Sequence, residues 1–551
     1  MKKKILLFFI LKTLLFSSSD FITSNGELSF KYNEKYNKIT RFNGNMETYK
    51  TDIDSLEVGI YYKGEHYLLS DYIISKRFIP QTNIFETVAK LPYGKIKTTY
   101  IPSMVDKNSF YIINNYEIKK GETLEFLYLF NMSDRNGIIE YKKTKDYYKY
   151  NENIYIKNLK NSMAGYIVPA SELEVVKLKK IEDSSIKYRD QRMVMSSKVR
   201  LSDGEKSDIV QIRYGKTPDF LSFESSERLL FLEKTYWMEW LKPIPFKVDT
   251  RTRKIVERFL IYLKTSTDGF DYYTNIGLRE TSKTKDVLYT AMTFIKYGYL
   301  DDAEQILTRL VEKEEEEFFY LSRTKLTIEE VQEAYVYLSY LKESDDTKFY
   351  TEYIEKIQKK IHKIVEGVKQ DLNKKNILEK GYEFKIYYYT YNLLKLYREI
   401  DGDRKYAPME EMLKNYLFKN FISGDGIKKY ALDKKNTYSK WEYLLLYDNV
   451  ETKRLIDKLY SDSIFKRYPY FSSEKSVDVE VNLSLLGGLY LNDLSRFGDI
   501  NLLQLNEDIE GNSMKIPDKI YLKGGKRYEV NGIDIYLSSK YLNTVYDRSE
   551  E

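Results

Sequence analysis

The hydrophobic pattern of this chain changes its period near residue 223. From about Gly26 to about Leu221, short apolar runs are separated by turn pieces such as Lys63-Gly64, which is typical of antiparallel strands. After Phe223, apolar residues recur every three or four positions, the spacing of one face of a helix. With 551 residues, the chain is also too long for one compact core. The sequence therefore predicts an antiparallel β-supersandwich followed by a helical domain.

The helical part opens with a linker helix over residues 225–240, which Pro243 and Pro245 end. Further helices follow from apolar faces at 255–263, 303–311 and 331–341, and from helical patterns at 346–371, 385–400, 406–420, 438–447, 451–460 and 478–495. A long series of antiparallel helices with short connections predicts an (α/α)6 barrel. A superhelical repeat protein is the alternative, but no fixed repeat period is found.

The first residues have the pattern of a signal segment. Lys2, Lys3 and Lys4 are followed by an apolar run that Lys12 interrupts, and then by small residues at 17–19. The apolar run is too short for a comfortable membrane span. We therefore expect an exported protein (periplasmic, envelope-associated or secreted), with cleavage left open and an N-terminal extension of a cytoplasmic protein as the alternative. We divide the chain into a signal peptide or N-terminal anchor (1–22), a β-sandwich domain (23–223), a linker helix (224–248) and a catalytic (α/α)6 barrel (249–551).

Composition limits the chemistry that the chain can perform. There is no cysteine, which excludes disulfides, thiolate metal sites and cysteine nucleophiles. His66 and His362 are the two histidines, so a histidine-rich metal site is excluded and a Ser-His-Asp triad is disfavoured. Acid and base roles therefore fall to carboxylates, tyrosine or lysine. The 89 basic and 83 acidic residues nearly balance, which gives no signature of nucleic-acid binding.

Tyrosine is unusually frequent, with 54 residues. Its ring can stack on a sugar while its hydroxyl forms hydrogen bonds, which suits carbohydrate binding. An AT-rich genome, which favours Tyr, Lys, Ile and Asn codons everywhere, explains the same composition. The tyrosine content alone therefore decides little.

Several short stretches carry a resemblance to a known family. They are Tyr236-Trp-Met-Glu-Trp240, Ile276-Gly-Leu-Arg-Glu-Thr281, Leu326-Thr-Ile-Glu-Glu-Val331, Asn376-Ile-Leu-Glu-Lys-Gly-Tyr382, Lys515-Ile-Pro-Asp-Lys-Ile-Tyr521 and the closing segment at 532–541. In this order they resemble glycoside hydrolase family 15, the bacterial glucoamylases and glucodextranases. The resemblance extends over nearly the whole chain after the signal segment. It implies the same sandwich-plus-barrel fold and requires no metal or organic cofactor.

The resemblance also implies catalytic roles. Arg279 and Glu280 fall where the family grips the terminal sugar, Glu379 falls on the general acid, and Asp518 falls on the general base. An inverting glycosidase needs two such carboxyl groups about 6.5–9.5 Å apart, one to protonate the leaving oxygen and one to activate water. Because the chain folds back on itself in a barrel, residues as distant as these two in sequence can meet at its mouth.

Two aromatic residues are candidates for sugar stacking. Trp441 and Tyr521 each offer a ring for this purpose, and burial in a core is the alternative for both. Three positions depart from the family pattern: Glu280 and Asp518 exchange one acidic residue for the other, and Leu378 replaces a tryptophan.

These observations leave three functional hypotheses. The first is an inverting exo-glycosidase that hydrolyses α-glucosidic linkages at glycan chain ends. The second is a degenerate relative that binds glycan, or is associated with an envelope polysaccharide, without cutting it. The third is an inverting disaccharide phosphorylase, although no His, Ser and Gly constellation for phosphate is found. The expected partner is an oligo- or polysaccharide, with an α-glucan favoured and a monomeric protein assumed.

Overall fold

The structure is a computed structural model of the whole chain. It describes residues 20–549 apart from 44–50, 119–122, 135–138, 145, 151–152, 170–178, 181–185, 189–190, 201–205, 216, 219, 221–224, 245, 267–283, 318–324, 374, 376–382, 403, 422–475, 491–494, 522–526 and 530–533. Contacts divide the chain into two compact units, 1–242 with 260–281 and 243–259 with 282–551. Each unit is described by itself below.

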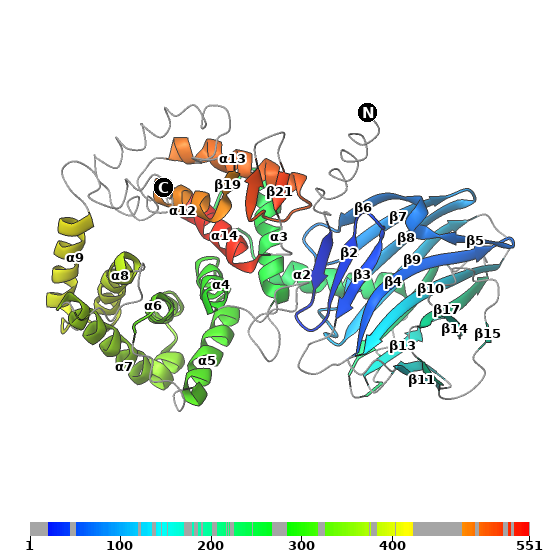
Figure 1. Cartoon of the computed structure of the whole chain (residues 1–551), viewed down its shortest axis with the longest axis horizontal. Helices are drawn as coiled ribbons and strands as arrows, with labels where there is room; N and C mark the ends of the chain where they lie inside the picture. The colour runs from blue at the N-terminus through cyan, green and yellow to red at the C-terminus, as the bar shows by residue number, and fades with distance from the viewer. Residues whose placement is uncertain are drawn as a thin grey trace, which may run out of the picture. The chain divides into compact units, whose positions relative to one another are not determined.

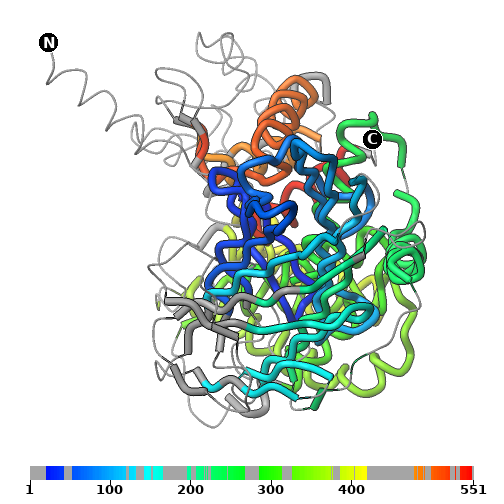
Figure 2. The backbone as a smooth tube through the Cα atoms, turned by 90° about the vertical axis from the view of Figure 1, so that its right-hand side faces the viewer, coloured from blue at the N-terminus to red at the C-terminus, as the bar shows by residue number. Residues whose placement is uncertain are grey.

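The first unit contains two antiparallel sheets (Figures 1 and 2). The first has the order β1-β2-β3-β4-β10-β17-β14-β15, with β5 also paired to β4, and the second has the order β16-β11-β12-β13-β18-β9-β8-β7-β6. The strands of the first are β1 (Phe21–Ser24), β2 (Ser29–Asn33), β3 (Lys38–Asn43), β4 (Thr51–Tyr62), β5 (Glu65–Leu68), β10 (Thr123–Asp134), β14 (Met163–Pro169), β15 (Lys179–Lys180) and β17 (Gln191–Arg200). Those of the second are β6 (Ile73–Phe78), β7 (Phe85–Leu91), β8 (Gly94–Pro102), β9 (Ser109–Ile118), β11 (Ile139–Lys143), β12 (Tyr148–Tyr150), β13 (Ile154–Asn158), β16 (Ile186–Tyr188) and β18 (Ser207–Tyr214). A short 3-10 helix, η1 (Leu69–Tyr72), joins β5 to β6.

Aromatic rings fill the space between the two sheets. Phe30 of β2 lies 5.3 Å from Phe110 of β9, and Phe42 of β3 lies 4.7 Å from the same ring, measured between ring centroids. Tyr32 of β2 packs against Phe85 of β7 at 4.8 Å. All five side chains are buried in one continuous core, so the two sheets pack face to face as a sandwich. The predicted β-sandwich is confirmed.

Strand β9 is buried on both of its faces. Phe110 and Ile112 point into the inter-sheet core, while Tyr111 and Ile113 belong to a second cluster on the outer face. That second cluster includes Leu229 of helix α2 (Ser226–Trp240), which covers this part of the second sheet. A strand covered on both faces has a continuous apolar run instead of clean alternation, as the sequence of β9 shows.

Polar groups fix α2 to the sheet that it covers. Buried Trp237 donates from Nε1 to Oδ1 of Asn83 at 2.9 Å. The buried carboxylate of Glu233 accepts a hydrogen bond from the Ser103 hydroxyl and a 3.0 Å bond from the backbone N–H of Met104. The expected linker helix is therefore an integral part of the first unit, held by its indole and by its carboxylate.

A buried carboxylate also organises the interior of the sandwich. Asp208 of β18 has no exposed surface, and its Oδ1 accepts hydrogen bonds from Asn158 at 2.6 Å, Asn161 at 2.8 Å and Ser197 at 2.9 Å. The Tyr128 hydroxyl donates to its Oδ2 at 2.5 Å. Burial, followed by the charge of Asp208, raises the pKa of Tyr128 well above its ordinary value. Four donors around one carboxylate are the arrangement that a buried charge requires.

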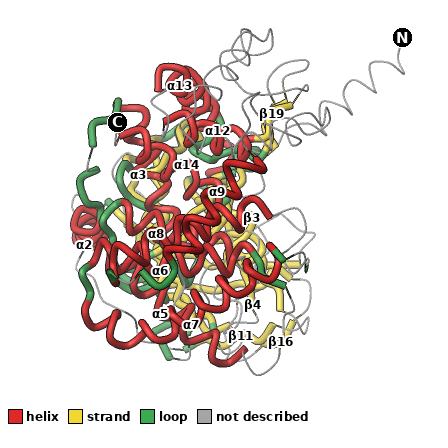
Figure 3. Tube along the Cα trace, turned by 90° about the vertical axis from the view of Figure 1, so that its left-hand side faces the viewer, coloured by secondary structure: helices red, strands yellow, loops and turns green. Residues whose placement is uncertain are grey.

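The second unit is mainly helical. It contains α4 (Thr284–Lys296), α5 (Leu300–Glu317), α6 (Ile328–Ser344), α7 (Thr347–Leu372), α8 (Glu383–Asp401), α9 (Ala407–Phe421), α12 (Val479–Tyr490), α13 (Ser495–Gly511) and α14 (Ile535–Ser549). A small antiparallel sheet accompanies them, formed by β19 (Ser476–Asp478, labelled in Figure 3), β20 (Lys519–Tyr521) and β21 (Arg527–Glu529), with β20 in the middle. Helix α3 (Thr250–Ser266) contributes residues to both units.

Successive inner helices of this unit are neighbours. Contacts join α12 to α14, α14 to α4, α4 to α6, and α6 to α8. Figure 1 shows α5, α7 and α9 along the outer side of α4, α6 and α8. This two-layer arc of helical hairpins confirms the predicted helical C-terminal part. The helices predicted at 438–447 and 451–460 lie outside the described residues.

The predicted helices differ from the structure mainly at their ends. The prediction at 346–371 corresponds to α7, and that at 385–400 corresponds to α8. The helix predicted at about 478–495 corresponds to α12, which ends earlier, at Tyr490. Asp534 explains the start of α14, since its carboxylate accepts from the backbone N–H of Leu537 at 2.7 Å.

The structure shows where the β-sandwich begins, which can be compared with the boundary predicted after residue 22. Residues 1–19, which carry most of the expected signal segment, lie outside the described residues. Strand β1 begins at Phe21, whose ring lies 4.8 Å from Phe85, and Asp20 forms a 2.7 Å ion pair with Lys31. Residues 20–22 therefore belong to the sandwich. None of the helices in the described part of the chain is both long and apolar enough to span a bilayer.

Candidate functional site

A charged cluster lies at the N-terminal ends of helices in the second unit. Glu480 is the second residue of α12, and its carboxylate accepts a 2.7 Å hydrogen bond from the hydroxyl of Tyr536, the second residue of α14. The ammonium of Lys540, one turn further along α14, lies 4.0 Å from the same carboxylate. Lys285 is the second residue of α4, and Lys385 is the third residue of α8. We call these five residues the Glu480 cluster.

The electrostatics of the cluster keep Glu480 ionised. Burial acts to raise the pKa of the Glu480 carboxyl, but the charge of Lys540 and the hydrogen bond from Tyr536 oppose it. The charges of Lys285 and Lys385 act in the same lowering direction. The net result is a pKa below the ordinary value for glutamate. The N-terminus of α12 adds a favourable dipole, since helix N-termini stabilise negative charge.

Tyr536 is fixed from several sides. The ammonium of Lys285 lies 3.9 Å from the centroid of its ring, a cation–π contact. The ammonium of Lys540 lies 3.5 Å from its hydroxyl oxygen, and the ring of Tyr289 meets it edge-on at 4.8 Å. Tyr536 is itself buried, so these contacts fix the hydroxyl that orients Glu480. Glu480, which lies beside this ring, is only half-buried, so its carboxylate is accessible.

Asp518 adjoins the cluster through its backbone. Its carbonyl oxygen accepts a 3.2 Å hydrogen bond from the N–H of Val479, the residue immediately before Glu480. Strand β20 follows Asp518 directly, and its first residue, Lys519, pairs with Asp478 of β19. Buried Ile516 precedes this turn. The loop that carries the predicted base is therefore attached to the start of α12.

The other predicted site residues are placed as follows. Tyr521 ends β20, where its backbone pairs with Ser476 and Arg527. Arg279, Glu280, Glu379 and Trp441 lie outside the described residues, so their roles stay predictions. In the sequence, 279 and 280 stand shortly before α4 begins, and 379 stands shortly before α8 begins.

Sequence reasoning did not single out the Glu480 cluster. Tyr536 and Lys540 do fall within the segment 532–541 that resembles the closing segment of family 15, but no role was attached to them. The sequence offers only their positions in the predicted helices as a signal. Acidic and basic residues near helix N-termini form a site only when several helices bring them together in space, and the sequence alone does not show this. In the described part of the chain, no group of three or more His, Asp or Glu side chains is arranged to hold a metal ion.

What the cluster can do chemically follows from its groups. An ionised carboxylate accepts hydrogen bonds from hydroxyl groups, while three lysines and the helix N-termini favour partial or full negative charge. A polyhydroxylated ligand can use both kinds of group at once. The same positive field would also accommodate an inorganic anion such as phosphate.

Comparison with known proteins identifies the fold. No protein-family model matches the chain, and no curated sequence matches it. Among solved structures, the chain is similar to a "putative kojibiose phosphorylase from human microbiome", with a TM-score of 0.51 and 11% identity over 96% of this chain and 86% of the other. A family 92 inverting mannosidase from Bacteroides thetaiotaomicron gives a TM-score of 0.42 at 7% identity, covering 89% of this chain and 83% of the other. A rhamnosidase from Klebsiella oxytoca gives 0.41 at 8%, covering 79% and 91%.

At 11% identity, the first of these similarities shows the fold alone. This chain and that phosphorylase structure share a multidomain layout, with β-sandwich sheets at the N-terminus and a helical part at the C-terminus. This similarity does not show that the chain belongs to family 15. Activity must therefore be argued from the chemistry of the Glu480 cluster.

Proposed function

We propose that this protein is a carbohydrate-active enzyme that breaks glycosidic bonds at the ends of glycan chains. The observation that carries the proposal is the ionised Glu480, which is hydrogen-bonded to Tyr536 and whose charge is stabilised by Lys285, Lys385 and Lys540. Two further facts support it: the predicted base, Asp518, adjoins α12, and the fold resembles that of the phosphorylase structure. The arc of helical hairpins formed by α4 to α9, α12 and α14 supports the (α/α)6 barrel that we propose.

The specific reaction that we propose is inverting hydrolysis of an α-glucosidic linkage. Glu379 would protonate the glycosidic oxygen as the bond to the anomeric carbon breaks. Asp518 would accept a proton from the water that attacks from the opposite face, so that the released sugar has inverted configuration. Arg279 and Glu280 would hold the terminal sugar.

The remaining residues would position the substrate. In this scheme Trp441 and Tyr521 would stack on sugar rings, and the carboxylate of Glu480 would accept hydrogen bonds from sugar hydroxyl groups. No metal or organic cofactor takes part. An exported protein, as residues 1–22 predict, would meet polysaccharides of the cell envelope or its surroundings.

Phosphorolysis is the second candidate, and the lysines favour it. Lys285, Lys385 and Lys540 all act on one carboxylate, and helix N-termini adjoin them, which is a setting that attracts phosphate. Phosphate would then replace water as the nucleophile and yield a sugar 1-phosphate with inverted configuration. A third possibility, glycan binding without cleavage, follows from the replacements at 280, 378 and 518.

The decisive experiment measures turnover with and without phosphate. The purified protein is incubated with maltose, isomaltose, kojibiose, trehalose, longer α-glucans and β-linked controls, and the anomeric form of each product is followed. Free β-glucose from an α-linked substrate supports hydrolysis, whereas β-glucose 1-phosphate that requires phosphate supports the second candidate. Silence across the panel under both conditions overturns the proposal that the protein is an enzyme acting on these linkages.

Carboxylate variants then assign the roles. Glu379→Gln and Asp518→Asn should abolish turnover while substrate binding persists, because each removes one proton-transfer group. Glu480→Gln should mainly raise KM. If Glu480→Gln instead abolishes turnover and Asp518→Asn does not, Glu480 is the base and the assignment of Asp518 is wrong.

A further inference from the structure

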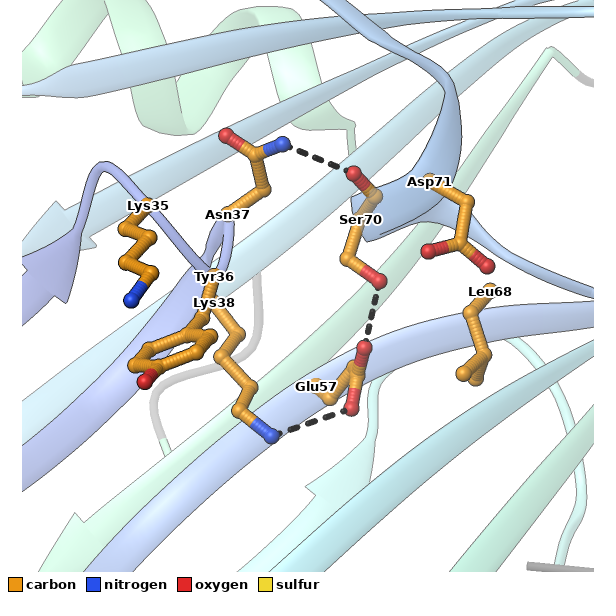
Figure 4. A pocket seen from close by; sticks show the side chains of 8 residues that line it. All are labelled: Lys35, Tyr36, Asn37, Lys38, Glu57, Leu68, Ser70 and Asp71. Atoms are coloured by element: carbon orange, nitrogen blue, oxygen red, sulfur yellow. Dashed lines mark hydrogen bonds and ion pairs between the residues drawn. The ribbon is translucent and has the colours of Figure 1, made fainter. Parts of the chain in front are cut away.

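A hollow of about 500 Å³ lies on the first unit, far along the chain from the Glu480 cluster (Figure 4). It is lined by the turn between β2 and β3, by the first residue of β3, by β4, by the last residue of β5 and by η1. Its volume falls within the roughly 300–1,000 Å³ range of small-molecule sites. The side chains that line it are polar or aromatic, apart from Leu68.

The rim of the hollow presents an aromatic ring to solvent. Tyr36, in the turn between β2 and β3, is 55% exposed, and its backbone N–H donates to Oδ1 of Asn33 at 2.9 Å. The ammonium of Lys35 lies 5.3 Å from the centroid of its ring. An exposed tyrosine ring that is not packed into a core is available to stack on the apolar face of a sugar.

The backbone beside this ring is held in an uncommon conformation. Asn37 has a φ of 51°, in the left-handed region that few side chains adopt. Its side chain explains how that conformation persists: Nδ2 donates to the carbonyl oxygen of Ser70 at 2.8 Å, and Oδ1 accepts from the ammonium of Lys76 at 2.9 Å. The turn is therefore tied to η1 and β6, which fixes the position of Tyr36. Strained backbone that neighbouring contacts maintain is often a feature of binding sites.

The floor of the hollow carries hydrogen-bonding groups for hydroxyls. Figure 4 shows Glu57 between Ser70 and Lys38, with Asp71 across from it. The carboxylate of Glu57 accepts from the Ser70 hydroxyl at 2.5 Å and lies 3.6 Å from the Lys38 ammonium. A carboxylate has about four acceptor positions, so these two contacts leave room for further donors. The exposed carboxylate of Asp71 has no hydrogen bond or ion pair with another residue of the described chain.

The charges of the hollow identify the kind of ligand. Lys35 and Lys38 balance Glu57 and Asp71, so the site has no net charge to select an anion or a cation. An exposed aromatic ring beside balanced acceptors and donors fits a neutral, ring-shaped, polyhydroxylated ligand. We propose that this hollow is a second glycan-binding site, separate from catalysis, which takes a pyranose unit of a neutral glycan with Tyr36 stacked on the sugar and Glu57 and Asp71 accepting from its hydroxyls.

Such a site would contribute mainly to the binding of long glycans. Its open form predicts weak binding, with a dissociation constant on the order of 1 mM for a short oligosaccharide. A weak contact on the same chain as a catalytic site raises the effective concentration of a long glycan near that site. The site would therefore matter for polysaccharide and not for a disaccharide.

Affinity electrophoresis of the full-length protein tests the proposal. The protein runs in acidic native gels that contain soluble starch, dextran or laminarin, and retardation gives the apparent affinity. We expect retardation by at least one of these glycans, weakened about five- to tenfold or more in Tyr36→Ala and also weakened in Glu57→Gln. The matched control is Phe231→Ala, because this ring is 59% exposed in the same unit and should leave retardation unchanged.

The outcomes separate this proposal from that of catalysis. Wild-type protein that none of the three polymers retards, or a Tyr36→Ala protein retarded as strongly as wild type, overturns the second site. Equal loss in Phe231→Ala also overturns it, because the effect would then be unspecific. Turnover of a disaccharide should be the same in Tyr36→Ala and wild type. A Tyr36-dependent retardation without any turnover would sustain this site while the proposed enzymatic function fails.

Discussion

The hydroxyl of Tyr536 donates a 2.7 Å hydrogen bond to the carboxylate of Glu480, a residue 56 positions earlier in the chain. This bond joins the first turns of α12 and α14, and three lysines act on the carboxylate at its centre. The bond therefore does two things at once: it orients a phenol and it helps to keep a carboxyl group ionised.

Removal of that hydroxyl should weaken activity without unfolding the protein. In Tyr536→Phe the ring and its contact with Lys285 remain, while Glu480 loses a hydrogen bond to a charged acceptor, which is worth about 1.5–3 kcal/mol. We expect kcat/KM to fall about ten- to hundredfold.

The same variant should change the acidic side of the pH profile. Because the hydrogen bond lowers the pKa of Glu480, its loss should move the acidic limb of kcat/KM to higher pH. Kinetics from pH 3 to pH 8 measure both effects, with Tyr289→Phe as the control that keeps the Glu480 bond. An unchanged profile in Tyr536→Phe would show that Glu480 is not required in its ionised form.

Glu233 should make the protein less stable as the pH rises. Burial raises the pKa of this carboxyl, although its bonds from Ser103 and Met104 act in the lowering direction. A pKa raised in the folded state means that the protonated form is favoured there, so the stabilising contribution is complete below the unfolded-state pKa of about 4.3 and is lost as the pH rises through the folded-state value.

Glu233→Gln tests that dependence. The amide keeps the shape, can donate to the Ser103 hydroxyl and can accept from the N–H of Met104, yet it does not titrate. We expect the free energy of unfolding of the variant, relative to wild type, to increase between pH 4 and pH 8. Urea denaturation at each pH measures it. A constant difference between the two proteins over this range would contradict the assigned pKa shift.

The indole of Trp237 should contribute measurably to stability. Trp237→Phe keeps an aromatic ring but removes the donor to Asn83, which leaves a buried amide oxygen without that partner. We expect a loss of about 1–3 kcal/mol in the free energy of unfolding. Met238→Ala, at a neighbouring position that is 66% exposed, should change it by less than about 0.5 kcal/mol. Equal effects of the two changes would indicate that α2 is not docked through the indole.

The carboxylate of Asp208 should be the most sensitive position of the sandwich interior. Asp208→Asn would place an amide N–H₂ group against donors from Tyr128, Asn158 and Ser197, so at least one buried donor loses its acceptor. A loss of about 3 kcal/mol is expected. Thermal unfolding followed by circular dichroism provides the measurement, with the exposed Asp71→Asn as the control. If both variants melt alike, the buried network does not contribute as the geometry implies.

The fold was predictable from sequence because each half has one dominant period. Two departures show the limit. β9 is apolar on both faces because α2 covers one of them, and a period-two pattern cannot show that cover. The helix predicted at about 478–495 corresponds to α12, which ends at Tyr490, because an apolar pattern does not fix the last residue of a helix.

The site was less predictable because proximity in space is not encoded locally. Asp518 was predicted from a motif, and its role stays a prediction; the structure shows only that its carbonyl oxygen accepts a hydrogen bond from the N–H of Val479. Lys285, Glu480 and Tyr536 belong to helices that are far apart in the chain, and each alone resembles an ordinary residue at a helix start. Their shared position depends on how α4, α12 and α14 pack, which no single stretch of sequence specifies.

The cover that α2 provides has a consequence for how the protein is made. On the ribosome the strands emerge before residues 226–240, so the outer face of β9, with Tyr111 and Ile113, stays exposed until α2 has been synthesised. Domains generally fold as units in the order of their synthesis, and exposed apolar surface in that interval favours aggregation. A rare-codon pause placed before α2 should therefore lower the soluble yield, whereas the same pause placed after α2 has left the ribosomal exit tunnel should leave it unchanged.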